Sequence, residues 1–124
     1  MSRIRSQDTG PERRVRSLLH RLGFRFSLRY RSLPGRPDVV LPARRSVVFV
    51  HGCFWHRHRA CILSAMPKTH QAFWNQKFKR TIARDSANRL SLRKLGWKVI
   101  TVWECELRRE GSLARRLRRS ITAS

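Results

Sequence analysis

Acidic residues and long apolar segments are scarce in this sequence. Asp and Glu account for 7 of the 124 residues, against 29 Lys and Arg, which gives a formal net charge of +22. The longest uncharged apolar run covers residues 46–50, which is too short to cross a bilayer and excludes a membrane-spanning protein. No apolar stretch follows the basic N-terminus, so we expect no export signal and a cytoplasmic location.

Cysteine is also rare, and its number is odd. With three cysteines, at least one thiol stays unpaired, which argues against a disulfide framework. The length allows one hydrophobic core, and 40% hydrophobic residues suffice to build it. We therefore expect a single domain over residues 1–124. A monomer is the default, because no apolar face beyond the core is evident.

The charge imbalance predicts a polyanionic partner, and nucleic acid is the natural one. Each phosphate that Lys or Arg neutralises releases counterions, so such binding weakens steeply with salt. Most of the cations are Arg, whose planar guanidinium suits bidentate contacts to phosphate. An anionic membrane surface is the weaker interpretation, because no segment combines a wide apolar face with a Lys/Arg face.

The hydrophobic pattern predicts an α/β fold. A capping box at Thr9–Glu12 and the spacing of the following apolar residues indicate a first helix that stops at Gly23. The elements predicted along the chain are a helix over 9–22, strands over 24–30, 39–41 and 46–50, a helix over 69–94 with a break allowed, a strand over 97–103, and a last helix around 113–121. Helices before and after a small sheet indicate a layered arrangement.

Asp38 has the clearest chemical context of the few acids. It follows a Pro-Gly-Arg-Pro turn and begins a predicted strand. If strands 39–41 and 46–50 form a hairpin, Asp38 and His51 become neighbours, and a carboxylate at such a place can hold Mg²⁺ against a scissile phosphate. The layout resembles the restriction-endonuclease-like nuclease core, in which Pro-Asp precedes Asp/Glu-x-Lys. Here Phe49-Val50-His51 replaces the second half of that pattern. The alternative interpretation is that Pro-Gly-Arg-Pro-Asp38 is simply a turn.

A Cys/His cluster follows directly. Cys53, His58 and Cys61 lie close together in sequence, and Cys105 comes at the end of the strand over 97–103. These four residues make a Cys₃His set, which is a normal closed tetrahedral zinc site. Zinc would pin an irregular loop to the sheet. His56 is an alternative fourth ligand by spacing, and unrelated thiols and exposed histidines are the other interpretation.

His51 and His56 are then left for other chemistry. A carboxylate hydrogen-bonded to an imidazole orients the ring and makes it a better base. Asp85, on the long helix, is a candidate partner of His56. The alternative for Asp85 is a surface ion pair with Arg84 or Arg89.

Aromatic pairs stand at Phe54-Trp55 and at Phe73-Trp74. Core packing is the ordinary explanation for such residues. Apolar side chains inserted between base steps are a known means of opening DNA, however. An aromatic pair inside a polar, basic loop fits that second role.

The motifs together resemble one family. They are, in chain order, Leu33-Pro-Gly-Arg-Pro-Asp38, His51-Gly-Cys-Phe-Trp-His56, Phe73-Trp74-x2-Lys77, Arg84-Asp85, and Leu95-Gly-Trp97 through Trp103-Glu-Cys105. This set looks like the very short patch repair (Vsr) DNA mismatch endonucleases, over about residues 1–119. The resemblance implies a restriction-endonuclease-like core with a zinc-stapled loop. It also implies nicking of double-stranded DNA on the 5′ side of the thymine in T·G mismatches that arise from 5-methylcytosine deamination.

The resemblance also implies roles for residues. Asp38 would bind Mg²⁺ together with the backbone carbonyl of Val50, and Glu12 falls at an acidic position near that metal. His51 and His56 would act at the phosphate and activate water, with Asp85 orienting His56. The structural zinc would be held by Cys53, His58, Cys61 and Cys105.

The remaining implied roles concern DNA and partners. Phe54, Trp55 and Trp74 would wedge into the helix beside the mismatch, with Lys77 nearby on the DNA side and the Met1 segment closing over the other groove. Mismatch-repair proteins are candidate partners, and DNA binding implies association with a bacterial nucleoid. Two alternatives stay open: a nuclease of the same core with another DNA target, and a non-catalytic zinc module that binds nucleic acid.

Overall fold

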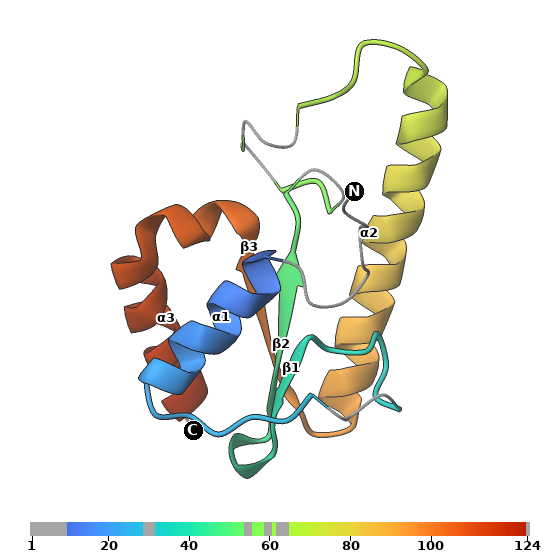
Figure 1. The fold of residues 1–124 in the computed structure, drawn as a ribbon. Helices are drawn as coiled ribbons and strands as arrows, with labels where there is room; N and C mark the ends of the chain where they lie inside the picture. The colour runs from blue at the N-terminus through green and yellow to red at the C-terminus, as the bar shows by residue number, and fades with distance from the viewer. Residues whose placement is uncertain (1–9, 29–31, 54–55, 59–60, 62–64, 124) are drawn as a thin grey trace.

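The computed structural model describes residues 10–28, 32–53, 56–58, 61 and 65–123 (Figure 1). The elements in chain order are α1 (Gly10–Arg21), β1 (Val39–Leu41), the 3₁₀ helix η1 (Pro42–Arg44), β2 (Ser46–His51), α2 (Gln71–Lys94), β3 (Lys98–Trp103), the 3₁₀ helix η3 (Glu104–Arg109) and α3 (Glu110–Thr122). Among the helices that the structure describes, none is both long and apolar enough to span a membrane.

A small mixed sheet forms the centre of the fold. Its strand order is β1-β2-β3, with β1 antiparallel and β3 parallel to the central β2. The parallel pair needs a crossover connection, and α2 supplies it. The predicted α/β fold, a small mixed sheet flanked by helices, is confirmed.

Helices cover both faces of the sheet, with α1 and α3 on one side and α2 on the other (Figure 1). The strands alternate accordingly. Val39, Leu41 and Val48 pack with the apolar residues of α1 and α3, whereas Val40, Val47 and Phe49 pack with Leu92 of α2 and with Trp97. Because strand side chains point to opposite faces in turn, the near-continuous apolar runs of β1 and β2 serve two cores at once.

One prediction is wrong in the segment that follows α1. Gly23 has a φ of 89°, and the N–H of Phe24 donates to the carbonyl of Leu19, so the helix closes with a left-handed cap. The strand expected over 24–30 does not form in the described part, where only Ser27 makes an isolated bridge, to Val40. The three-residue β1 offers too short an edge to pair a longer partner, and Leu28 is 47% exposed.

The long helix α2 runs without a break and ends at the predicted glycine. Gly96 has a φ of 93°, and the N–H of Trp97 donates to the carbonyl of Leu92. Arg45 reinforces this end, because its guanidinium donates to the carbonyl of Leu95 and lies 4.5 Å from the centre of the Trp97 ring. A cation at the carboxyl end of a helix also interacts favourably with the helix dipole.

The topology brings several chain ends to one edge of the sheet. The carboxyl ends of β2 and β3 lie together because these strands are parallel, and His51 is the register partner of Trp103. The amino end of β1 lies at the same edge because β1 runs the other way. Asp38, Val50, His51 and Trp103 therefore meet where the strands stop.

Candidate active site and metal cluster

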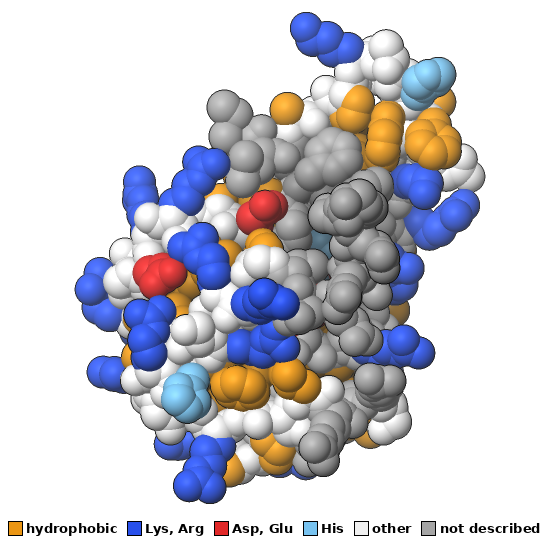
Figure 2. Space-filling model, viewed as in Figure 1, with side chains coloured by type: hydrophobic (Ala, Val, Ile, Leu, Met, Phe, Trp, Pro, Cys, Tyr) orange, Lys and Arg blue, Asp and Glu red, His pale blue; other side chains and the backbone are white. Residues whose placement is uncertain are grey.

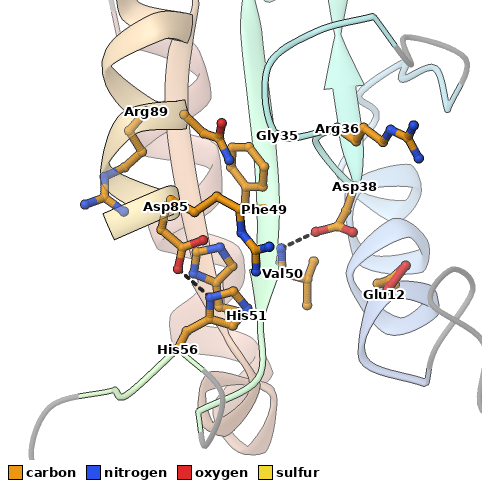
Figure 3. A pocket seen from close by; sticks show the side chains of 12 residues that line it. Glu12, Gly35, Arg36, Asp38, Phe49, Val50, His51, His56, Asp85 and Arg89 are labelled. Atoms are coloured by element: carbon orange, nitrogen blue, oxygen red, sulfur yellow. Dashed lines mark hydrogen bonds and ion pairs between the residues drawn. The ribbon is translucent and has the colours of Figure 1, made fainter. Parts of the chain in front are cut away.

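A pocket of about 770 Å³ opens at this edge (Figure 3). It lies between the sheet, α2 and the first turn of α1. Its titratable lining residues are Glu12, Arg36, Asp38, His51, His56, Arg84, Asp85 and Arg89. The five residues that we expected to carry catalysis (Glu12, Asp38, His51, His56 and Asp85) thus share one pocket, although they come from α1, β2, α2 and two loops.

Asp38 is held by the strand beside it. Its Oδ2 accepts a hydrogen bond of 2.6 Å from the backbone N–H of Val50, which fixes the carboxylate at the mouth of the hairpin (Figure 3). Burial raises the pKa of Asp38 to about 6, with a further increase from the nearby charge of Glu12. A buried carboxylate next to a second acid is a site that gains strongly from a bound cation.

His51 and His56 form a stacked pair. Their ring centroids are 3.8 Å apart and the rings are nearly parallel, at 5°. The Nδ1 of His56 lies 2.5 Å from Oδ2 of Asp85 (Figure 3). The carboxylate therefore fixes the His56 ring through Nδ1 and leaves Nε2 for other partners. The interpretation of Asp85 as a surface ion pair is not supported, because this acid is half-buried against the imidazole.

The two imidazoles lie in different electrostatic environments. Burial, together with the charge of His56, lowers the pKa of His51 to about 4, so His51 is neutral at pH 7. For Asp85, burial alone would raise the pKa. The hydrogen bond from His56 and the surrounding positive charges outweigh that effect and hold its pKa below the usual value. The pocket thus combines one neutral imidazole with one that is bonded to a carboxylate.

Three arginines in the lining were not foreseen as site residues. Arg36, Arg84 and Arg89 line the pocket together with the three carboxylates, so the formal charge of its lining is balanced before any cation binds. A divalent cation would make it positive and suited to a phosphate diester. The signal was present in the spacing, because Arg84 and Asp85 lie four residues before Asn88 and Arg89 on one face of a helix.

Gly35 explains how the turn before Asp38 comes so close to α2. Its φ is +76°, and a Cβ at this position would lie 2.8 Å from Nδ2 of Asn88. Only glycine allows both the left-handed backbone and this approach. The Pro-Gly-Arg-Pro segment is therefore a turn, as in the alternative interpretation, and the same turn carries Asp38 into the pocket that Asp85 also lines.

The Cys/His cluster assembles beside the pocket. Cys53, His58, Cys61 and Cys105 each offer one ligand atom, and these atoms all lie within 4.8 Å of one another. The Nδ1 of His58 lies 3.6 Å from Sγ of Cys53 and 3.4 Å from Sγ of Cys105. Zinc bonds of about 2.3 Å to sulfur and 2.0–2.1 Å to nitrogen, at tetrahedral angles, place S and N about 3.6 Å apart.

The donor set therefore fits zinc in both chemistry and spacing. Burial raises the pKa of the Cys53 thiol to about 12, and a divalent cation among the four ligands would reverse that and hold the sulfur as thiolate. His56, the alternative ligand, bonds to Asp85 instead and is not in this cluster.

The expected DNA-contacting residues are placed only in part. Met1, Phe54 and Trp55 lie outside the described residues. Trp74 is half-buried, with its ring centroid 5.8 Å from that of Phe78, while Phe73 is 53% exposed and has Lys77 Nζ 5.5 Å from its ring centre. Figure 2 shows hydrophobic side chains gathered over this end of α2, with basic side chains beside them.

Comparison with known proteins gives a consistent result. Residues 1–62 match the sequence model of the DNA mismatch endonuclease Vsr family. A type II nicking enzyme of Xanthomonas oryzae pv. oryzae is 47% identical over 124 residues, which is all of this chain and 90% of that protein. The DNA mismatch endonuclease Vsr of Escherichia coli is 45% identical over 108 residues, covering 87% of this chain and 69% of that protein.

A type II nicking enzyme of Neisseria meningitidis is 41% identical over 121 residues, or 98% of this chain and 86% of that protein. Proteins of this kind are DNA endonucleases. The pocket at the strand ends, the cluster beside it and these similarities lead to one conclusion: the chain belongs to the Vsr family of DNA mismatch endonucleases.

Proposed function

We propose that this protein is a Mg²⁺-dependent endonuclease that nicks one strand of double-stranded DNA on the 5′ side of the thymine in a T·G mismatch. One observation carries the proposal: the Asp38 carboxylate, fixed by the Val50 amide, opens into the same pocket as the stacked histidines and Asp85. A phosphate in that pocket would meet a cation site and an oriented imidazole together.

The residues divide the work of phosphodiester hydrolysis. Mg²⁺ at Asp38 and the Val50 carbonyl, with Glu12 nearby, would supply charge neutralisation at the phosphate and at the leaving 3′ oxygen. His56, oriented by Asp85, takes a proton from the attacking water at Nε2. His51, neutral and buried against the His56 ring, acts beside it at the phosphate.

Recognition of the mismatch rests on the aromatic residues and on the charge. A T·G wobble pair unstacks more easily than a matched pair, so aromatic insertion, at a cost of about a few kcal/mol per step, selects mismatched DNA. We assign this insertion to Phe54, Trp55 and Trp74, with the Met1 segment over the other groove and Lys77 beside the DNA.

We also propose that Cys53, His58, Cys61 and Cys105 hold one structural zinc. The protein acts as one domain and as a monomer, in the cytoplasm of a bacterium with access to chromosomal DNA. Mismatch-repair proteins would act after the nick.

A panel of labelled duplexes tests the specificity. We expect nicking of T·G duplexes in Mg²⁺ and at least about a hundredfold slower nicking of matched T·A and C·G duplexes, methylated or not. The names of two relatives specify only a nicking enzyme, so a related nuclease with another target is the second candidate. Equal nicking of matched duplexes at one sequence would favour it, and binding without any nicking would favour a non-catalytic zinc module.

A further inference from the structure

The indole of Trp103 lies between the two histidine sites. Its ring is stacked on that of His58, at 4.2 Å between centroids and 9° between planes. It also meets the ring of His51 edge to face, at 5.3 Å and 76°. Because His51 stacks on His56, four aromatic rings form one continuous series of contacts, in the order His56, His51, Trp103 and His58.

Hydrogen bonds to residues outside both sites help to fix the backbone of Trp103. Trp103 is the last residue of β3 and the register partner of His51. Its N–H donates to Oε1 of Glu106 at 2.9 Å, and Arg116 holds that carboxylate through two hydrogen bonds of 3.0 and 2.8 Å. The same guanidinium donates to the carbonyl of Thr101. The backbone that carries the indole is therefore fixed, and the indole contacts both neighbouring rings.

A second connection runs through the chain itself. His56 lies between the cluster residues Cys53 and His58, and its N–H donates to the carbonyl of Gly52. The N–H of His58 donates to the carbonyl of Cys53. A change at His58 can thus displace His56 along the backbone and displace His51 through the indole.

We propose that Trp103 is a positioning residue that couples the geometry of the Cys/His cluster to the His51–His56 pair. A metal in the cluster would fix the His58 ring, and the indole stacks on that ring. The edge-to-face contact between the indole and His51 then holds the His51 ring against His56. A branched aliphatic side chain has no flat face for either imidazole, so it would leave both rings free to turn. The catalytic meaning of this coupling rests on the proposed function, whereas the coupling between the rings does not.

Three variants of the zinc-loaded protein test the proposal. We expect Trp103→Leu to lower kcat on the T·G duplex at least about tenfold while the Kd for that duplex stays within about twofold. Trp103→Phe keeps a flat ring and should stay within about threefold of the wild type. Trp97→Phe is the control for the tryptophan-to-phenylalanine change, because Trp97 lies directly before β3 but packs under Arg45, away from the pocket. An unchanged kcat in a folded, zinc-loaded Trp103→Leu variant would overturn the proposal.

Proton NMR of the histidine rings gives a readout that does not depend on nicking. Replacing zinc by the larger Cd²⁺ in the wild type should shift the ring signals of His51 and His56, although neither is a cluster ligand. In Trp103→Leu the same exchange should shift the His51 signals much less than in the wild type, because only the backbone route through His56 remains. If Trp103→Leu does not fold, the wild-type exchange decides, and unmoved His51 signals there refute the coupling. Failure of the wild type to nick would refute the proposed function but would leave this spectroscopic test intact.

Discussion

Asp38 occupies a position that disfavours its own charge. Burial and the neighbouring Glu12 raise its pKa from 3.8 to about 6. For an acid whose pKa is higher in the folded than in the unfolded state, ionisation destabilises the fold. The loss develops as the pH rises from about 4 to about 6 and is complete above that range. The charge of this carboxylate thus lowers the stability of the fold.

This gives a first prediction. In the absence of added Mg²⁺, Asp38→Asn should raise the free energy of unfolding at pH 7.5 by up to about 3 kcal/mol and leave it unchanged near pH 3. The amide oxygen can still accept the Val50 N–H, so the packing is preserved. Urea unfolding at the two pH values measures the difference. A variant that is less stable at pH 7.5, or a difference that does not depend on pH, would contradict the explanation.

The pair of His56 and Asp85 leads to a second prediction. Asp85→Asn removes the carboxylate that fixes Nδ1 of the ring, so kcat for nicking should fall about a hundredfold while DNA binding is retained. Single-turnover nicking and equilibrium binding to one T·G duplex separate the two effects. Ser91→Ala, at an exposed position of the same helix, is the control. Parallel losses of binding and nicking would mean that Asp85 serves the fold and not the chemistry.

At the scale of elements, the site depends on where each helix and strand stops. Asp38 precedes β1, His51 ends β2 and Trp103 ends β3, so their meeting follows from one antiparallel and one parallel pairing. The carboxyl end of α2 is fixed to the same sheet by Arg45, which has a left-handed backbone with a φ of 49°. Arg45 therefore combines a side chain that stabilises the end of α2 with a strained backbone.

A third prediction separates these two properties of Arg45. Arg45→Ala should cost about 1–2 kcal/mol of unfolding free energy, because it removes the helix-end and Trp97 contacts but keeps the strain. Arg45→Gly loses the same contacts and relieves the left-handed backbone, so it should be about 0.5–1 kcal/mol more stable than the alanine variant. Chemical denaturation of both variants gives the order. The reverse order would show that backbone strain at this position is negligible.

The elements also show what the sequence could and could not predict. Helices and buried strands were foreseen because apolar spacing, Gly23 and Gly96 act locally. The prediction of a strand over 24–30 was wrong. The alternation of Phe24, Phe26 and Leu28 says nothing about how long an edge β1 offers for pairing. The grouping of the catalytic candidates came from motif resemblance. Arg36 lies within one of these motifs and Arg89 lies one helical turn after Asp85, but neither pattern shows that the residue lines the pocket.

At the scale of the whole molecule, electrostatic repulsion is the dominant feature. The acids are few and several are already engaged, as Glu106 is with Arg116 and Glu110 with Arg14 and Arg21. The 29 Lys and Arg exceed the 7 acids by 22, so the acids can neutralise only a minority of the positive charge. Figure 2 shows basic side chains spread over the visible face. Such a surface favours a polyanion over any neutral ligand.

The fourth prediction concerns this charge. Affinity for a duplex should fall at least about a thousandfold between about 50 and 200 mM salt, as expected when six or more phosphates are neutralised. The preference for T·G over T·A duplexes should change much less, because phosphate contacts carry no sequence information. Binding titrations at several salt concentrations measure both quantities. A shallow salt dependence would mean that most of the cations do not face DNA.

The most direct test of the account is Mg²⁺-dependent nicking of one T·G duplex by the wild type and by Asp38→Ala. We expect the wild type to cut on the 5′ side of the thymine, and the variant to bind the duplex with about the same affinity but to nick it at least about a thousandfold more slowly. Nicking by Asp38→Ala at the wild-type rate would contradict the claim that this carboxylate binds Mg²⁺ in the pocket that holds the two imidazoles.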